Sequence, residues 1–303
     1  MGKSFLAVFY MMIVTAVLSA VAWNCDDALF VEIGFYGRAA DSKLTRASLS
    51  SVNAASLGEV RNFYLDAIAT TTPYPRNVFS ATLAKMSGNA IVYLDDAIVD
   101  SNRENFAAQV LSTFENNVLD KVRENFGNEP NVGVDGESRV SIVLLNGNGI
   151  TDGLAGYYSP VDLYLRDSGS ATYRSSNEGK IIYIKYGMAD TTTFGTLAHE
   201  FQHMINYYHK NKMLNYDATK LSEETWLNEA LAKYSEEVCG FSILDGDVNT
   251  ADLMRLSMGS NSSLSLTYWG PDTTYCYGQV YMFMHFLAYP GRYRSSSKEV
   301  TRA

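Results

Sequence analysis

The segment from Leu197 to Ile205 constrains this chain most, because it sets two histidines four positions apart with a glutamate directly after the first. On an α-helix, positions i and i+4 lie on one face, so His199 and His203 can present both imidazoles to one metal ion. Glu200 is turned by about 100° from His199, which sets it beside the metal rather than on it. The pattern therefore predicts a metal site with Glu200 as a general base for a metal-activated water.

The alternative is a chance triplet on an ordinary helix. The chain has only 4 histidines, which makes such a triplet uncommon by composition. The helical phase also argues against it, because the two histidines fall nearly opposite an apolar stripe. That stripe consists of Phe194, Leu197, Ala198, Phe201, Ile205 and Tyr208. These histidines are therefore not predicted to be core residues.

A catalytic zinc ion needs three protein ligands and one open position, so a third ligand is required. Glu229 is one candidate, on a helix predicted over residues 224–239. His209 is the other, because it follows His203 at the spacing of metzincin sites. Those sites need a glycine for a sharp turn where this chain has Asn206, which is less permissive. The sequence favours Glu229 and keeps a metzincin-type site with His209 as the alternative.

The chain resembles the gluzincin branch of zinc peptidases in the segments LAHEFQHMINYYH and WLNEALAKYSEE. It is most similar to the hyicolysin-type family of secreted bacterial neutral peptidases, over about Gly88 to Leu287. The similar part includes GLAGYYSPVD and SNEGKIIYI. The resemblance implies one catalytic Zn²⁺ held by His199, His203 and Glu229, with Glu200 as the base. It also implies that the substrate is a protein or peptide.

Two further residues follow from this resemblance. Thermolysin-like members carry an aspartate four residues after the ligand glutamate, bonded to a zinc-bound imidazole, where this chain has Lys233. Glu236 returns to the same helical face and is the candidate to replace that aspartate. The segment from Tyr275 to Gly278 resembles the Tyr-x-x-Gly of aminopeptidase-type gluzincins, whose tyrosine donates to the reaction's oxyanion. Tyr275 is therefore the predicted catalytic donor, with Tyr277 as its alternative.

Hydrophobic patterning predicts an α+β fold that is zincin-like, with a mixed β-sheet, an active-site helix and a helical C-terminal subdomain. Residues 37–85 show little sustained periodicity, so residues 23–87 are interpreted as an N-terminal cap or propeptide and 88–303 as the catalytic domain. A capping box at Ser101–Glu104 predicts the start of a helix that ends at Gly127. The predicted strands are Ala90–Leu94, Arg139–Leu145, Lys180–Tyr186 and an irregular edge strand within Gly153–Tyr164, and the later helices cover about 192–210, 224–239 and 277–288.

The first 22 residues are typical of a signal peptide, with an apolar run that ends in Ala20-Val21-Ala22. We therefore expect an exported protein, secreted or associated with the cell envelope. Cys25 is a candidate lipid-anchor site, which is the only membrane contact expected. Export also suggests a disulfide between Cys239 and Cys276. The net charge of −9 gives no electrostatic footprint for a nucleic-acid partner.

Peptide hydrolysis is therefore the predicted function, and two other classes stay open. The chain could be a catalytically silent zincin-fold envelope protein or adhesin, or a zinc-dependent binding module. Glu200 disfavours both, because it has no role as a ligand and a silent relative could lose it freely. The sequence indicates neither the cleavage preference nor the natural substrate.

Overall fold

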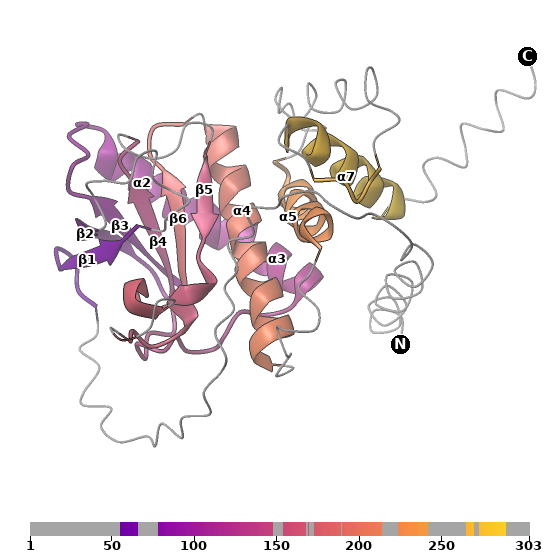
Figure 1. Ribbon diagram of the computed structural model, residues 1–303. Helices are drawn as coiled ribbons and strands as arrows, with labels where there is room; N and C mark the ends of the chain where they lie inside the picture. The colour runs from indigo at the N-terminus through magenta and orange to yellow at the C-terminus, as the bar shows by residue number, and fades with distance from the viewer. Residues whose placement is uncertain are drawn as a thin grey trace, which may run out of the picture. The chain divides into compact units, whose positions relative to one another are not determined.

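The computed structural model describes residues 55–65, 78–147, 154–167, 169, 173–188, 190–213, 224–241, 265–269 and 273–288 (Figure 1). The predicted signal peptide and Cys25 lie outside these residues. In the part of the chain that is described, no helix combines the length and the apolar character needed to cross a membrane.

Six strands form one mixed sheet in the order β1-β2-β3-β4-β6-β5. The three inner strands β3, β4 and β6 run parallel, whereas β1, β2 and β5 pair antiparallel with their neighbours. Every residue of β3 and β4 is buried, as expected for strands covered on both faces. The strands are β1 (Val60–Tyr64), β2 (Val78–Met86), β3 (Ala90–Asp95), β4 (Val140–Leu145), β5 (Gly156–Tyr158) and β6 (Ile181–Lys185). This sheet with its helices is compatible with the predicted α+β class.

The strand β1 and all of β2 except its last residue lie within residues 37–85, where we expected little regular structure. The expectation was wrong because small and polar residues hide the alternation in β2, where Phe79, Ala81 and Leu83 are buried between more exposed neighbours. A strand of this kind gives a weaker signal than a continuous apolar run. Thr82 of β2 pairs with Leu94 of β3. The sheet therefore continues across residue 88, where we divided the chain.

Helices cover one face of the sheet and bury the larger core against it (Figure 1). The helix α4 contacts β5 and β6 and also packs against α5, which in turn packs against α7. The helices are α2 (Arg103–Thr113), the π-helix η2 (Phe114–Val118), α3 (Leu119–Phe126), α4 (Asp190–Tyr207), the π-helix η5 (Tyr208–Met213), α5 (Thr225–Cys239) and α7 (Thr273–Ala288). Two short 3₁₀ helices, η3 (Pro160–Leu163) and η4 (Tyr173–Ser175), lie between β5 and β6.

The capping box predicted at Ser101 is not formed. The residue before α2 is Asn102, and its side chain makes no cap hydrogen bond. Instead, the carboxylate of Asp100 accepts a hydrogen bond from the backbone N–H of Asn102 at 2.8 Å. The predicted end at Gly127 is confirmed, since this glycine has a positive φ of 97° directly after α3.

On the opposite face of the sheet, a buried hydrogen-bond network connects the two segments GLAGYYSPVD and SNEGKIIYI. Asp162 accepts hydrogen bonds from the Tyr183 hydroxyl and from the backbone N–H of Asn177, both at 2.6 Å. The Asn177 side chain also exchanges hydrogen bonds with the backbone of Tyr64, at 2.7 and 2.9 Å. This network therefore links β1 to the loop that precedes β6.

We expect Asp162→Asn to destabilise the fold by about 1–3 kcal/mol, because an amide offers one acceptor oxygen where two buried donors need acceptors. Urea unfolding followed by circular dichroism measures this loss. Glu124→Gln on the exposed side of α3 is the control and should change the free energy of unfolding by less than about 0.5 kcal/mol. An Asp162→Asn variant as stable as this control would contradict the assigned role.

Candidate metal centre

Three potential metal ligands converge where α4 packs against α5. His199 and His203 lie one turn apart on α4, and Glu229 lies in the second turn of α5. One donor atom from each lies within 4.8 Å of the others. Among the described residues this is the one group of three or more histidine, cysteine or acidic side chains with such spacing.

The distances fit a single ion. The Nε2 atom of His199 lies 3.2 Å from Oε2 of Glu229, and Nε2 of His203 lies 3.7 Å from Oε1. Nitrogen and oxygen ligands of tetrahedral zinc, at bond lengths of about 2.0–2.2 Å, are separated by roughly 3.3–3.6 Å. Two imidazole nitrogens and one carboxylate are also a donor set that suits zinc.

Both imidazoles are held by hydrogen bonds at their other nitrogen. Nδ1 of His199 donates to Oε1 of Glu236 at 2.8 Å, so the Glu236 contact anticipated from helical phase is present. Nδ1 of His203 lies 3.1 Å from Oδ1 of Asn228, which also accepts a hydrogen bond from Asn206. With Nδ1 engaged in each ring, Nε2 is directed toward Glu229. Asn228 was not among the predicted site residues, although it directly precedes Glu229.

The carboxylates around the two rings dominate the electrostatics. Burial lowers the pKa of His199, but its hydrogen bonds to Glu229 and Glu236 outweigh burial and raise the pKa to about 10. Burial raises the pKa of Glu229, yet the attraction of His203 and His199 holds this pKa well below its ordinary value. For Glu200, burial raises the pKa and the nearby histidines offset only part of the rise. A carboxylate with a raised pKa is a stronger base.

Three carboxylates lie in or near the group and need positive charge beside them. Glu200 and Glu236 are buried, and Glu229 is largely so, with 15% of its side chain exposed. Lys233 lies 3.0 Å from Glu236 and compensates one of these three carboxylates. In the absence of a metal ion, protons on the imidazoles balance the other carboxylates, which is why the pKa values of His199 and His203 are raised. A divalent cation between the histidines and Glu229 would supply the same positive charge in place of these protons.

A tyrosine of α7 reaches this group. The Tyr277 hydroxyl lies near Glu229, and its ring centroid lies 6.3 Å from that of His199. Burial and the neighbouring carboxylates hold the pKa of Tyr277 well above its ordinary value, so the hydroxyl keeps its proton. Tyr275, the predicted donor, lies in the first turn of α7, and its side chain is outside the described part of the structure.

The other two histidines lie away from this group. His209 belongs to η5, and its Nε2 points at Gly127, where an added Cβ would lie 2.7 Å away. The metzincin alternative requires His209 to join His199 and His203, and the structure does not bring it to them. His285 is buried and lies 2.8 Å from a carboxylate oxygen of Glu237, which makes it a link between α7 and α5.

The predicted disulfide between Cys239 and Cys276 is wrong, because both cysteines are free and buried. The contacts of α7 with α5 explain this result. Tyr277 lies beside Glu229 and His285 beside Glu237, so the two helices run in the same direction. Cys276 then lies at the start of α5, and Cys239 lies at its end. That separation of about 16 Å along the helix exceeds the reach of a disulfide.

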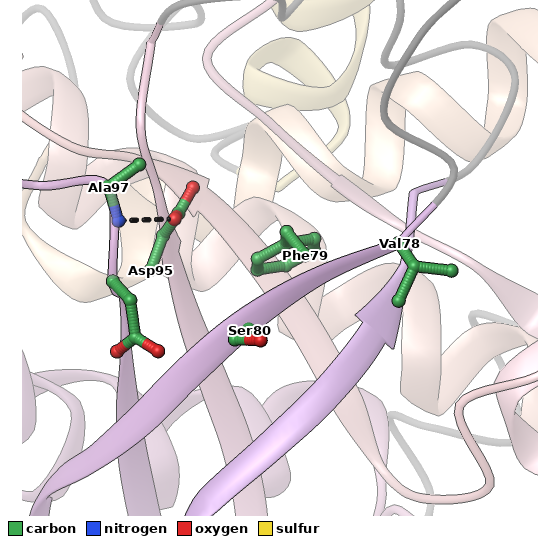
Figure 2. A pocket seen from close by; sticks show the side chains of 6 residues that line it. Val78, Phe79, Ser80, Asp95 and Ala97 are labelled. Carbon is green, nitrogen blue, oxygen red and sulfur yellow. Dashed lines mark hydrogen bonds between the residues drawn. The ribbon is translucent and has the colours of Figure 1, made fainter.

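Figure 2 shows a pocket at β2 and the end of β3, lined by Val78, Phe79, Ser80, Asp95, Asp96 and Ala97. None of these residues belongs to the ligand group. One oxygen of Asp95 accepts the backbone N–H of Ala97 at 2.9 Å, and the other accepts that of Asn146 at 3.1 Å. These bonds give Asp95 the role of closing the turn after β3.

Comparison with known proteins relates the chain to the metalloproteases. It is 25% identical over 258 residues to the neutral metalloprotease ShpI of Staphylococcus hyicus. The match covers 80% of this chain and 54% of that protein, so the chain spans about half the length of this relative. No family model matches the chain. This similarity supports a relationship to metalloproteases in general. It does not by itself support the narrower hyicolysin-type family.

Proposed function

We propose that this chain is a zinc-dependent peptidase of the gluzincin type with a zincin-like catalytic domain. His199, His203 and Glu229 would hold one catalytic Zn²⁺. The observation that carries the proposal is the convergence of these donors within 4.8 Å of one another. The similarity to a neutral metalloprotease supports the same reaction class.

Bound zinc would supply Lewis-acid chemistry, polarising the scissile carbonyl and lowering the pKa of a water molecule toward neutrality. Glu200 is the proposed base that takes the proton of this water and delivers it to the leaving amine. Its position supports this role, because it follows His199 on α4 and is 94% buried by its surroundings, with 6% of its surface exposed. The raised pKa of Glu200 favours proton uptake.

The edge strand β5 is the proposed site for the substrate backbone. Among the described strands, β5 is the last in the sheet and pairs only with β6. A substrate peptide could therefore pair antiparallel with its other side. Gly156 permits the close packing of β5, since a Cβ there would lie 2.6 Å from both the Tyr183 carbonyl oxygen and the side chain of Thr196 in α4. A peptide on β5 would therefore lie next to the helix that carries the proposed ligands.

Several properties of the whole protein stay proposals. We infer export through the signal-like residues 1–22, a protein or peptide substrate, and a membrane contact limited to a lipid anchor at Cys25. The catalytic domain is proposed to occupy residues 88–303 with strands contributed from before that point. A silent zincin-fold adhesin remains the rival function, and the buried Glu200 beside the donor group argues against it.

Casein digestion tests the proposed function directly. We expect the full chain with one equivalent of zinc to cleave casein, a chelator to stop cleavage, and added zinc to restore it. Zinc content is measured on the same samples by atomic absorption. A protein that binds zinc tightly and cleaves no peptide or protein substrate would support the silent alternative instead.

Tyr277 is the proposed donor to the oxyanion formed during hydrolysis, in preference to Tyr275, because its ring lies 6.3 Å from that of His199 and its hydroxyl lies near Glu229. We expect Tyr277→Phe to lower kcat by about 10²–10³-fold, the typical effect of losing an oxyanion donor. Zinc content and melting temperature should hold. Tyr275→Phe is the matched variant, and a loss of kcat confined to it would return the role to Tyr275.

A further inference from the structure

Lys233 occupies an unusual position for a cation, directly behind a proposed zinc ligand. Its Nζ atom lies 3.0 Å from both carboxylate oxygens of Glu236, which follows three residues later on α5. Glu236 in turn accepts a hydrogen bond from Nδ1 of His199 at 2.8 Å. Lys233, Glu236 and His199 therefore form a continuous line that ends at Nε2 of the imidazole.

The surroundings restrain this line. The side chains of Lys233 and Glu236 are 17% and 9% exposed. On the α4 side, a Cβ added to Gly195 would lie 3.5 Å from Oε2 of Glu236, so the helix backbone approaches the carboxylate closely. On the α7 side, Nζ of Lys233 lies 5.6 Å from the ring centroid of Tyr277. The ammonium is thus bounded by a carboxylate and an aromatic ring.

This geometry lets one side chain set the position of another. A carboxylate with one hydrogen bond can rotate about its last bond, whereas Lys233 contacts both oxygens and fixes the plane of the Glu236 carboxylate. A fixed carboxylate holds the proton of His199 on Nδ1 and directs Nε2 toward the metal. Partners of this kind typically change metal affinity by about 10–100-fold when they are removed.

We propose that Lys233 is a positioning residue of the metal centre that acts on His199 by fixing the carboxylate of Glu236. The proposal rests on the ligand set of the proposed function. A purely electrostatic role would have the opposite effect, because the positive charge of Lys233 would by itself repel the zinc ion. The two roles therefore predict opposite changes in zinc affinity when the charge is removed.

The test measures zinc affinity by competition with a chromogenic chelator, using the full chain. We expect Lys233→Met to raise the Kd for zinc by about 10-fold or more, and Lys233→Arg, which keeps two donors, to recover most of the affinity. Lys121→Met is the matched control, because Lys121 contacts the other end of α5 through the carbonyl oxygen of Cys239 at 3.2 Å. Its Kd should stay within about twofold of wild type, whatever happens to its melting temperature.

A double-mutant cycle with Glu236→Gln shows whether Lys233 acts through Glu236. In the Glu236→Gln background, Lys233→Met should produce no further loss of affinity. An unchanged or lower Kd for Lys233→Met would overturn the proposal, and so would a full effect that persists in that background. If Lys233→Met does not fold, Lys233→Gln replaces it in both arms. If the wild-type protein binds no zinc, the proposed function fails. If the wild type binds zinc and only the Lys233 variants behave differently from expectation, the proposed role of Lys233 fails alone.

Discussion

Glu200→Gln is expected to retain zinc and to lower kcat by about 10²–10⁴-fold, the range for loss of a general base. Glutamine keeps the shape of the side chain but cannot accept a proton at neutral pH. The ligand donors are untouched, because Glu200 lies outside the group formed by His199, His203 and Glu229. Single-turnover cleavage of a fluorogenic peptide, with zinc content measured in parallel, separates the loss of chemistry from the loss of metal.

Glu237→Gln is the control for this substitution. Glu237 is also a buried glutamate, but it bonds His285 rather than the ligand histidines. Its kcat should stay within a few-fold of wild type in zinc-loaded protein, even if its stability falls. Near-normal turnover by zinc-replete Glu200→Gln would refute the proposed role of Glu200.

Glu229→Ala is expected to abolish tight zinc binding and, with it, peptidase activity. The substitution removes the only carboxylate of the three-residue group and leaves two imidazoles, too few for a stable tetrahedral site. Equilibrium dialysis followed by metal analysis measures the stoichiometry. Wild type should bind close to one zinc per chain, and Glu229→Ala close to none.

His209→Ala is the informative comparison, because its spacing matches the rival metzincin pattern. Its Nε2 faces Gly127 and not the donor group, so the variant should still bind about one zinc. Loss of zinc in His209→Ala together with its retention in Glu229→Ala would reverse the assignment of the third ligand. The pair of variants thus decides between two site types within one experiment.

Much of the fold could be predicted because its inner strands are continuous apolar runs. Ala90–Leu94 and Lys180–Tyr186 match β3 and β6 to within a residue or two, since strands buried on both faces carry an unbroken signal. The strands β1 and β2 were missed for the opposite reason. Their pairing with β3 depends on long-range contacts, and their small polar residues give little local pattern.

The site shows the same division between local and long-range information. The spacing of His199 and His203 is set by one helix, so helical phase alone brings them together. Asn228 and Tyr277 meet the site only because α5 and α7 pack in one particular register. The mistaken pairing of Cys239 with Cys276 has the same origin, because no sequence pattern showed that these two helices run in the same direction.

The pairing of β2 with β3 limits how this chain could mature. Every residue of β3 is buried, and the strand is apolar up to Asp95. Proteolysis at residue 88 would detach β1 and β2 and expose the hydrogen-bonding groups along one side of β3 to other molecules. An exposed apolar edge of this kind promotes self-association. Removal of a leader before residue 55 would instead keep the six-stranded sheet whole, so a soluble mature form is expected to retain β1 and β2.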